Sequence, residues 1–167
     1  MAMILNGLRS RRQMIKAFKD ICAQLNGHKV EYLVIGGVAV IAHGYPRSTG
    51  DIDFWYRPTT ENYFNLLKAI KALGIDTSDL DRLVFDPQKS FLRIPALGIK
   101  AEFLPQVKGD TKFDAAYRRA KIFDLEGISV AIIGYDDLIK IKKDTNRPKD
   151  LGDIDELEKR RKSSGKS

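Results

Sequence analysis

Tyr32–Trp55 reads Y-L-V-I-G-G-V-A-V-I-A-H-G-Y-P-R-S-T-G-D-I-D-F-W. Leu33–Ile35 is apolar and rich in β-formers, which predicts a buried strand. Val38–Ala42 predicts one or two turns of buried helix, and Ile52–Tyr56 predicts a second strand. Residues 43–50 between them form a polar loop that Gly and Pro punctuate. The stretch therefore predicts a strand–turn–helix–loop–strand unit whose loop delivers two aspartates to the second strand.

Asp51 and Asp53 flank Ile52 at the start of this second strand. Side chains alternate along a strand, so the two carboxylates point to the same face, with Cα atoms about 6.5 Å apart. Carboxylates this close resist joint ionisation, and a cation between them removes the repulsion. Oxygen ligands suit Mg²⁺ or Mn²⁺, and Mg²⁺ is usually bound by one or two carboxylates together with substrate phosphates. We therefore expect a metal site at Asp51 and Asp53, against the plainer alternative of two solvated acids.

Gly36 and Gly37 lie at the break between the first strand and the helix. Two glycines let the backbone approach a ligand closely. The helix start that follows presents free N–H groups and the positive end of its dipole. This arrangement predicts a place for phosphates beside the expected metal site.

Two separated motifs carry a resemblance to a known family. The first is G-G followed by R-x-T-x-D-x-D, and the second is L-I-K-I-K-K-D-T-N-R-P-K-D-L-G-D-I near the C-terminus. Together they resemble the nucleotidyltransferase superfamily with the DNA polymerase β-like fold. Within it, the phrase from Gly36 to Asp53 is similar to a small bacterial branch that includes abortive-infection-type toxin nucleotidyltransferases. The resemblance covers roughly residues 30–157.

The resemblance implies an α/β (α+β) fold, with a small mixed sheet flanked by helices. It also implies Mg²⁺- or Mn²⁺-dependent transfer of a nucleoside monophosphate from a nucleoside triphosphate to a hydroxyl. In that chemistry Gly36 and Gly37 contact the β- and γ-phosphates. Many relatives have Ser at the second glycine, and Gly37 lacks that hydroxyl donor.

A third carboxylate is expected from a neighbouring strand by the same resemblance. Glu102 lies in K-A-E-F-L, within the predicted strand Ile99–Leu104, and is the best candidate by position. Many relatives have Asp here. The alternative is a charge that protects an edge strand from aggregation. Asp51, Asp53 and Glu102 are thus the predicted metal ligands and catalytic residues.

Three side chains of the loop before Asp51 are candidates for the site. Arg47 and Thr49 flank the carboxylates, and a guanidinium there could bind a phosphate or the acceptor. The alternative for Arg47 is an ion pair with Asp51 or Asp53. His43 is more typical of a structural or capping histidine. One further alternative concerns the aromatic residues that follow: Trp55 or Tyr56 could stack on a base, but a core position is favoured.

Lys142 matches the lysine of the second motif and by resemblance faces the nucleotide phosphates. Asp150 could orient this lysine or a nearby arginine, and Asp153 is assigned a structural part. The alternative is a surface helix whose charges pair at three- and four-residue spacing.

Composition places the chain among ordinary single domains. It has 167 residues, 43% apolar and 31% charged, with a net charge of +7. There is no 18-residue apolar run, Met1–Asn6 lacks the pattern of a signal peptide, and Cys22 is the only cysteine. We therefore expect a cytoplasmic protein that does not interact with membranes. Residues 1–162 are assigned to one domain, and 163–167 to a disordered tail.

The charge is uneven along the chain. Residues 1–30 hold six Lys/Arg and one acid, residues 140–167 hold ten and six, and residues 31–139 hold thirteen and fifteen. A basic rim on a mildly acidic body suits a polyanion such as RNA. The alternative is that basic ends only aid solubility.

Other elements follow from periodicity and turn residues. Helices are predicted at Leu8–Leu25, from Thr59 or Thr60 to Leu73, at Lys112–Arg119, Tyr135–Lys143 and Lys149–Arg161, and a short one within Leu80–Phe85. Strands are predicted at Ser90–Ile94, Lys121–Leu125 and Ile128–Ile132.

Three functions remain open on this basis. The first is a nucleotidyltransferase that acts on an RNA end, a protein or a small molecule, with a toxin–antitoxin role and a cognate antitoxin or partner protein. The second is a catalytically silent nucleotide- or RNA-binding protein. The third is a small-molecule transferase like the aminoglycoside nucleotidyltransferases.

Overall fold

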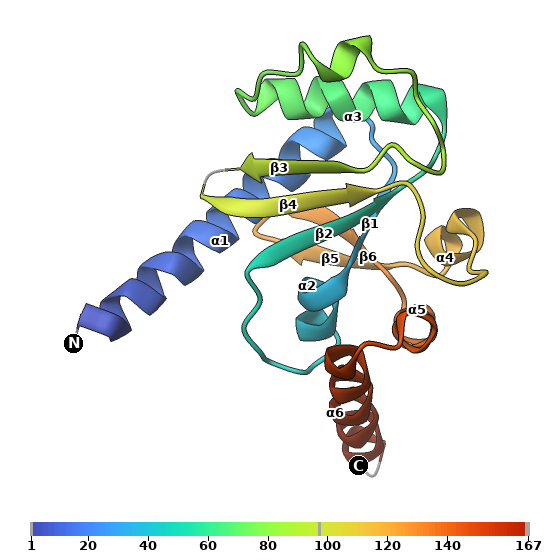
Figure 1. Ribbon diagram of the computed structural model, residues 1–167. Helices are drawn as coiled ribbons and strands as arrows, with labels where there is room; N and C mark the ends of the chain where they lie inside the picture. Colours follow the sequence, from blue (N-terminus) through green and yellow to red (C-terminus); the bar gives the residue numbers. More distant parts are fainter. Residues whose placement is uncertain (1, 97, 166–167) are drawn as a thin grey trace.

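The computed structural model describes residues 2–96 and 98–165, and one mixed sheet organises them (Figure 1). Its six strands have the order β3-β4-β2-β1-β6-β5. β1 is antiparallel to β2 and parallel to β6, whereas β2 is parallel to β4. The strands are β1 Tyr32–Ile35, β2 Asp51–Tyr56, β3 Leu92–Ala96, β4 Ile99–Leu104, β5 Lys121–Leu125 and β6 Ile128–Ile132. The predicted class, a small mixed sheet flanked by helices, is confirmed.

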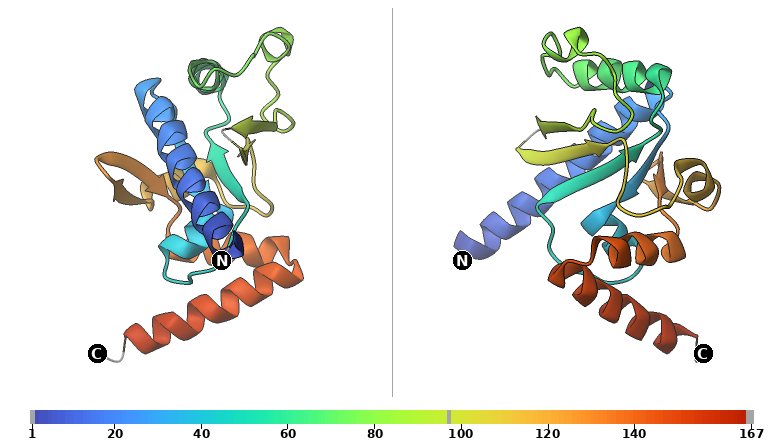
Figure 2. Two further views of the ribbon diagram at one scale, coloured as in Figure 1. Left: turned by 90° about the vertical axis from the view of Figure 1, so that its left-hand side faces the viewer. Right: turned by 45° about the vertical axis from the view of Figure 1, so that its right-hand side comes forward.

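Helices cover both faces of the sheet (Figures 1 and 2). They are α1 Ala2–Gly27, α2 Gly36–Ala42, α3 Thr60–Ala72, α4 Phe113–Arg118, α5 Tyr135–Thr145 and α6 Pro148–Ser164, with a 3₁₀ turn at Leu80–Arg82. α1 and α3 pack together on the face to which Phe54 points, where Phe18 of α1 meets the Phe54 ring. α2 and α5 lie on the other face, and α6 leads away from α5.

The core is continuous across the sheet. Phe54 stacks on Phe103 at 4.9 Å between ring centroids, and Tyr32 meets Phe54 edge to face. All three rings are buried, as is the single cysteine, Cys22. Because these residues alternate with the polar residues of β2 and β4, the opposite face of the two strands is left for charged side chains.

Several helix and strand bounds differ from the sequence-based ones. α1 begins at Ala2 rather than Leu8, and its first turns extend beyond the sheet (Figure 1). β3 lies two residues later than predicted. The expected helix within Leu80–Phe85 is a single 3₁₀ turn, and Val84 is 91% exposed, so this segment contributes little to the core. The predicted turn around Leu97 includes a residue outside the described ones.

The C-terminal helix is longer than expected. Ser163 and Ser164 belong to α6, and their hydroxyls donate to the carbonyls of Lys159 and Arg160. The disordered tail predicted from residue 163 is therefore wrong for these two residues, while 166–167 lie outside the described part. Within residues 2–96 and 98–165, no helix is long and apolar enough to cross a membrane.

Candidate active site

Three carboxylates share one face of the central strands. Asp53 of β2 lies directly beside Glu102 of β4, and Asp51 lies beside Lys100. Paired residues of neighbouring strands point to the same side of a sheet, so the three acids form one group. β4 is internal, between β3 and β2. The edge-strand alternative for Glu102 is therefore wrong, and its charge must be explained by what it faces.

Two cations lie against these acids. Arg93 Nε is 2.8 Å from Glu102 Oε1, and Lys100 Nζ is 3.6 Å from the same oxygen and 3.4 Å from Asp51 Oδ1. Among the described residues, no three acidic, imidazole or thiol side chains converge in the manner of a metal-binding group. The three acids adjoin, and Arg93 and Lys100 engage the oxygens of Glu102 and Asp51.

Asp53 has the most perturbed carboxyl of the group. Burial, and then the negative charges of Glu102 and Asp51, raise its pKa to about 6, against opposing effects of Arg147 and Lys100. A raised pKa means that the surroundings of this carboxyl disfavour its ionised form. The site therefore favours an added cation or a proton at Asp53.

Gly36 makes the closest approach to this carboxyl. Its φ is +65°, and a Cβ there would lie 2.1 Å from Asp53 Oδ2. Ile35, at the N-cap of α2, supplies no side-chain cap. The first turn of α2 thus presents bare backbone beside Asp53, as expected for a backbone that approaches a ligand.

Gly36→Ala is expected to reduce the activity that the two motifs predict by at least about tenfold and to lower the free energy of unfolding by about 1–3 kcal/mol, from the positive φ and the displaced carboxylate. Gly74→Ala is the matched control, because Gly74 also has a positive φ, +83°, but has open space around it. That variant should lose stability and keep its activity. Equal activity losses in both variants would contradict a specific contact between Gly36 and Asp53.

Gly37 is small for a different reason. A Cβ there would lie 2.6 Å from Thr49 Oγ1 and 3.2 Å from an Arg47 nitrogen. A serine at this position would have to displace Thr49, whose hydroxyl donates to the Asp51 carbonyl at 3.1 Å. The Thr49 hydroxyl therefore occupies the space that a side chain at position 37 would take.

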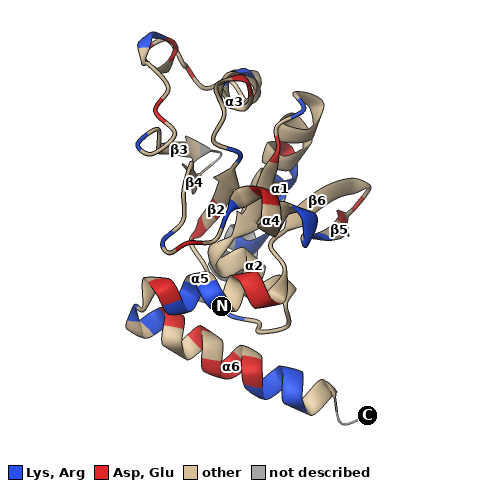
Figure 3. Ribbon diagram, turned by 90° about the vertical axis from the view of Figure 1, so that its right-hand side faces the viewer, with Lys and Arg blue, Asp and Glu red and all other residues tan. Residues whose placement is uncertain are grey.

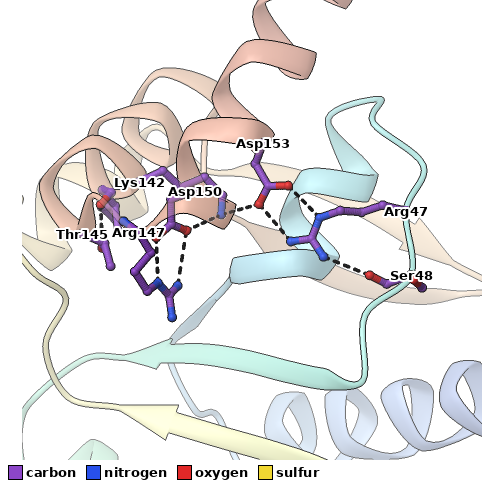
Figure 4. Close-up of polar contacts among 8 residues, drawn as sticks. Arg47, Ser48, Lys142, Thr145, Arg147, Asp150 and Asp153 are labelled. Carbon is purple, nitrogen blue, oxygen red and sulfur yellow. Dashed lines mark hydrogen bonds and ion pairs between the residues drawn. The ribbon is translucent and has the colours of Figure 1, made fainter.

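Side chains of alternating charge form a chain of ion pairs close to Gly37 and Asp53 (Figure 4). Lys142 Nζ is 3.1 Å from Asp150 Oδ1 and 2.9 Å from Asp153 Oδ2. Arg47 Nε lies 2.8 Å from Asp153 Oδ1, and Arg147 Nε lies 2.7 Å from Asp150 Oδ2. The order is Arg147–Asp150–Lys142–Asp153–Arg47, which we call the charge chain.

The contacts of the charge chain contradict two alternatives that the sequence left open. Arg47 pairs with Asp153 and not with Asp51 or Asp53. Lys142, Asp150 and Asp153 are 5%, 1% and 3% exposed, so they do not form a solvated helix surface. The chain also explains why the two motifs occur together, because Arg47 of the first contacts Asp153 of the second. Burial raises the pKa of Asp150, but hydrogen bonds from Arg147 and Lys142 outweigh it and leave the pKa lowered.

Arg147 was not among the predicted site residues. It is the open end of the charge chain, with a side chain 68% exposed, and its positive charge acts on Asp53. Its position in the R-P-K-D motif could have marked it as a site residue, but only the fold brings that motif next to β2. Arg147 is therefore an accessible cation beside Asp53, whereas Lys142 is largely enclosed by two aspartates.

A pocket of about 260 Å³ joins these parts. Gly36, Asp53 and Glu102 line one wall, and Lys142 and Arg147 line another. The remaining lining comes from Ile35, Leu104, Gln106, Val107, Lys108, Leu138, Ile141, Thr145 and Asp150. Two larger hollows of about 660 and 680 Å³ adjoin Tyr135 and Arg161 near α6, and none of the three carboxylates lines them.

The nearby aromatic and imidazole side chains are structural. His43 Nε2 is 2.7 Å from the Ile133 carbonyl oxygen. Trp55 is 2% exposed, and its Nε1 donates to the Pro105 carbonyl. Tyr56 is fully buried. The core positions favoured for Trp55 and Tyr56, and the structural part favoured for His43, agree with these contacts.

The expected basic rim is divided. Basic residues gather at the C-terminal end of α6, which points away from β2 and β4 (Figure 3). Among them Lys159 pairs with Asp155, and Arg161 pairs with Asp136. The cations that adjoin the carboxylates are instead Arg93 and Lys100 of the sheet and Arg147 at the start of α6.

Solved structures with this arrangement include nucleotidyltransferases. TM1012 of Thermotoga maritima, provisionally assigned as a nucleotidyltransferase, superposes with a TM-score of 0.55 over 94% of this chain and 96% of its own, at 16% identity. The antibiotic-resistance factor ANT(2'')-Ia superposes with a TM-score of 0.55 over 90% and 92%, at 13% identity. This chain has a nucleotidyltransferase fold.

The resemblance of the two motifs and the structural similarity agree on this fold, and the similarity spans nearly the whole of each chain. No family model matches the sequence, and no curated protein is significantly similar to it. At identities of 16% and 13%, the nucleotidyltransferase fold is shared, but the substrates of these neighbours do not follow for this chain.

Proposed function

We propose that this protein transfers a nucleoside monophosphate from a nucleoside triphosphate to a hydroxyl acceptor, with Mg²⁺ or Mn²⁺. The observation that carries the proposal is the pairing of Asp53 with Glu102 in the sheet, beside a Gly36 that has no room for a side chain. Acids and bare backbone at one point are what a triphosphate with its metal requires.

The carboxylates suit a divalent cation. Asp51, Asp53 and Glu102 offer only oxygen ligands, which Mg²⁺ and Mn²⁺ prefer. A cation would relieve the repulsion that contributes to the raised pKa of Asp53. Bound there, divalent ions supply charge stabilisation for the attacking and leaving oxygens. Binding requires Glu102 and Asp51 to give up their contacts with Arg93 and Lys100, which are exposed enough to move.

The chain's own residues account for the remaining steps. Backbone groups of Gly36 and Gly37 and the Arg147 guanidinium bind the phosphates, while the charge chain holds Arg147 and Arg47 in place. The acceptor oxygen attacks the α-phosphorus, a new P–O bond forms, and the bond to pyrophosphate breaks. A Glu102 oxygen takes the hydroxyl proton, and pyrophosphate leaves toward Arg147.

The proposal is tested with each α-³²P-labelled nucleoside triphosphate, Mg²⁺ or Mn²⁺, and total cell extract. Wild type should move label onto RNA, protein or a small molecule, and Asp51→Ala/Asp53→Ala should not. The fraction that carries the label identifies the acceptor class. Absence of transfer with every nucleotide, in a protein that binds nucleotide by calorimetry, would overturn the enzymatic proposal.

That negative outcome would favour a silent nucleotide- or RNA-binding protein. The specific observation behind this second candidate is that Arg93 and Lys100 already neutralise Glu102 and Asp51. The intact set of three acids weighs against it, because binding alone does not require the repulsion that raises the pKa of Asp53.

A small-molecule acceptor is the third candidate. It is favoured by the similarity to ANT(2'')-Ia, an aminoglycoside nucleotidyltransferase. Arg93 and Lys100 weigh against it, since exposed cations beside the carboxylates repel a polycationic drug. Transfer of label to an aminoglycoside, but not to RNA or protein, would establish this candidate.

A toxin–antitoxin role rests on the motif resemblance to abortive-infection-type toxins. We infer growth inhibition when wild type is expressed from an inducible promoter, and none with Asp51→Ala/Asp53→Ala. A protein that labels its acceptor without slowing growth would separate the activity from toxicity and remove the need for a cognate antitoxin.

A further inference from the structure

In the proposed transfer, the order of the strands separates the side of the triphosphate from the side of the acceptor. Across the sheet, the residues beside one another are Asp53 of β2, Glu102 of β4 and Arg93 of β3. The phosphate side, with Gly36 and Arg147, lies at Asp53. β3 is the edge of the sheet beyond β4 (Figure 1). An acceptor that reaches Glu102 from the side opposite the triphosphate therefore crosses β3.

Two exposed cations lie at this side of the site, Arg93 on the edge strand β3 and Lys100 on the neighbouring β4. The side chains of Arg93 and Lys100 are 58% and 43% exposed. Their ion pairs among the described residues are with Glu102 and Asp51. A divalent cation at these carboxylates, as proposed above, releases both side chains from these ion pairs. A backbone phosphate of the acceptor is an anion with which they can then pair.

An aromatic ring completes the surface. Phe91 directly precedes β3 and is 42% exposed. The Arg93 guanidinium lies 5.6 Å from its ring centroid, so the ring lies next to the cation that pairs with Glu102. A ring with adjacent cations is how proteins bind unpaired bases together with their phosphates.

We propose that Phe91, Arg93 and Lys100 form the acceptor surface, and that the acceptor is the end of a single-stranded polynucleotide. A base stacks on Phe91, adjoining phosphates pair with Arg93 and Lys100, and the terminal hydroxyl reaches Glu102. This inference rests on the proposed nucleotidyl transfer and names its acceptor class. Bases inside a duplex are covered on both faces by their neighbours and cannot stack on Phe91, so the surface favours an unpaired strand.

The test is fluorescence anisotropy of labelled RNA and DNA oligonucleotides of one sequence, single-stranded and as duplexes, over a range of KCl concentrations. Phe91→Ala should weaken single-strand binding by about tenfold or more, as expected for loss of base stacking. Arg93→Gln/Lys100→Gln should weaken it similarly and reduce the slope of log K against log salt by about 1.4, for two lost phosphate contacts. The tighter of RNA and DNA identifies the natural polymer.

The matched control is Arg160→Gln/Lys162→Gln, which removes the same charge from the far end of α6. It should leave both affinity and salt slope nearly unchanged. An equal effect of this control, or equal binding of duplex and single strand, would overturn the proposed surface.

Nucleotide binding separates this inference from the proposed function. Calorimetric affinity for the nucleoside triphosphate should be unchanged in Phe91→Ala, because the ring lies beyond Glu102 from the phosphate side. Loss of polynucleotide binding with nucleotide binding retained supports the surface. If Phe91→Ala labels an acceptor as fast as wild type does, the proposed acceptor surface is wrong and the transferase proposal still stands.

Discussion

Asp53→Asn is expected to abolish nucleotidyl transfer, by about a thousandfold or more, while making the protein more stable at neutral pH. The loss follows from removing a charged ligand of the proposed metal site. The gain follows from the raised pKa of Asp53, about 6 against an ordinary 3.8, which means that its ionised form is unfavourable in the folded chain. At about 1.4 kcal/mol per pKa unit, relief of this penalty is worth about 1–3 kcal/mol.

The sign of the pH dependence follows from the same shift. Between pH 6 and pH 4, folded wild type holds a proton on Asp53 that the unfolded chain has released. The folded state therefore binds more protons, and this group makes wild type more stable as pH falls through 6. Asp53→Asn lacks this contribution, so its advantage should be full above pH 7 and should shrink toward pH 4.

Thermal unfolding at pH 7.5 and pH 5, in the absence of metal, measures both effects. For a chain of this size, 1 kcal/mol corresponds to about 2–4 °C in Tm. Asp51→Asn is the control, because its carboxyl is 46% exposed and pairs only with Lys100. It should lose activity with a stability change within about 0.5 kcal/mol. A lower Tm for Asp53→Asn at pH 7.5 would show that this carboxylate stabilises the fold.

Lys142→Met is expected to have the largest effect on stability, about 3–5 kcal/mol, because it leaves Asp150 and Asp153 buried with their central cation removed. Both aspartates are at most 3% exposed, so water cannot replace the ammonium group. The outer cations cannot compensate, since Arg147 and Arg47 each already pair with one of them. Docking of α6 onto α5 should weaken, and the Arg147 guanidinium should lose its fixed position.

Lys143→Met tests whether the position within the charge chain matters. Lys143 is the next residue of α5, its side chain is 60% exposed, and its ion pair with Glu158 is long at 4.0 Å. Its replacement should change the free energy of unfolding by less than about 0.5 kcal/mol. Urea unfolding of both variants gives the comparison. Similar small losses in the two would mean that the charge chain contributes little to folding.

Local pattern was enough for much of the fold. The hairpin strands Lys121–Leu125 and Ile128–Ile132 have the predicted bounds, because Glu126-Gly127 adopts positive φ at both residues and determines the turn. Thr59 caps α3 by accepting from the Asn62 N–H, as a helix start signal indicates. Long apolar periodicity was similarly informative for α1. Positions without such signals, among them β3 and the segment around Leu80, were placed less well.

By itself the sequence determined the fold class and the face of Asp51 and Asp53, because alternation along a strand depends only on local backbone geometry. It could not determine which cation meets which acid. Arg47 and Asp153 are separated by more than a hundred residues, and Arg93 reaches Glu102 only through strand pairing. Such contacts depend on how the sheet and α6 pack. The tertiary structure alone therefore decided that Lys142 is enclosed, that Arg147 faces the pocket, and that the open edge beside Glu102 carries positive charge.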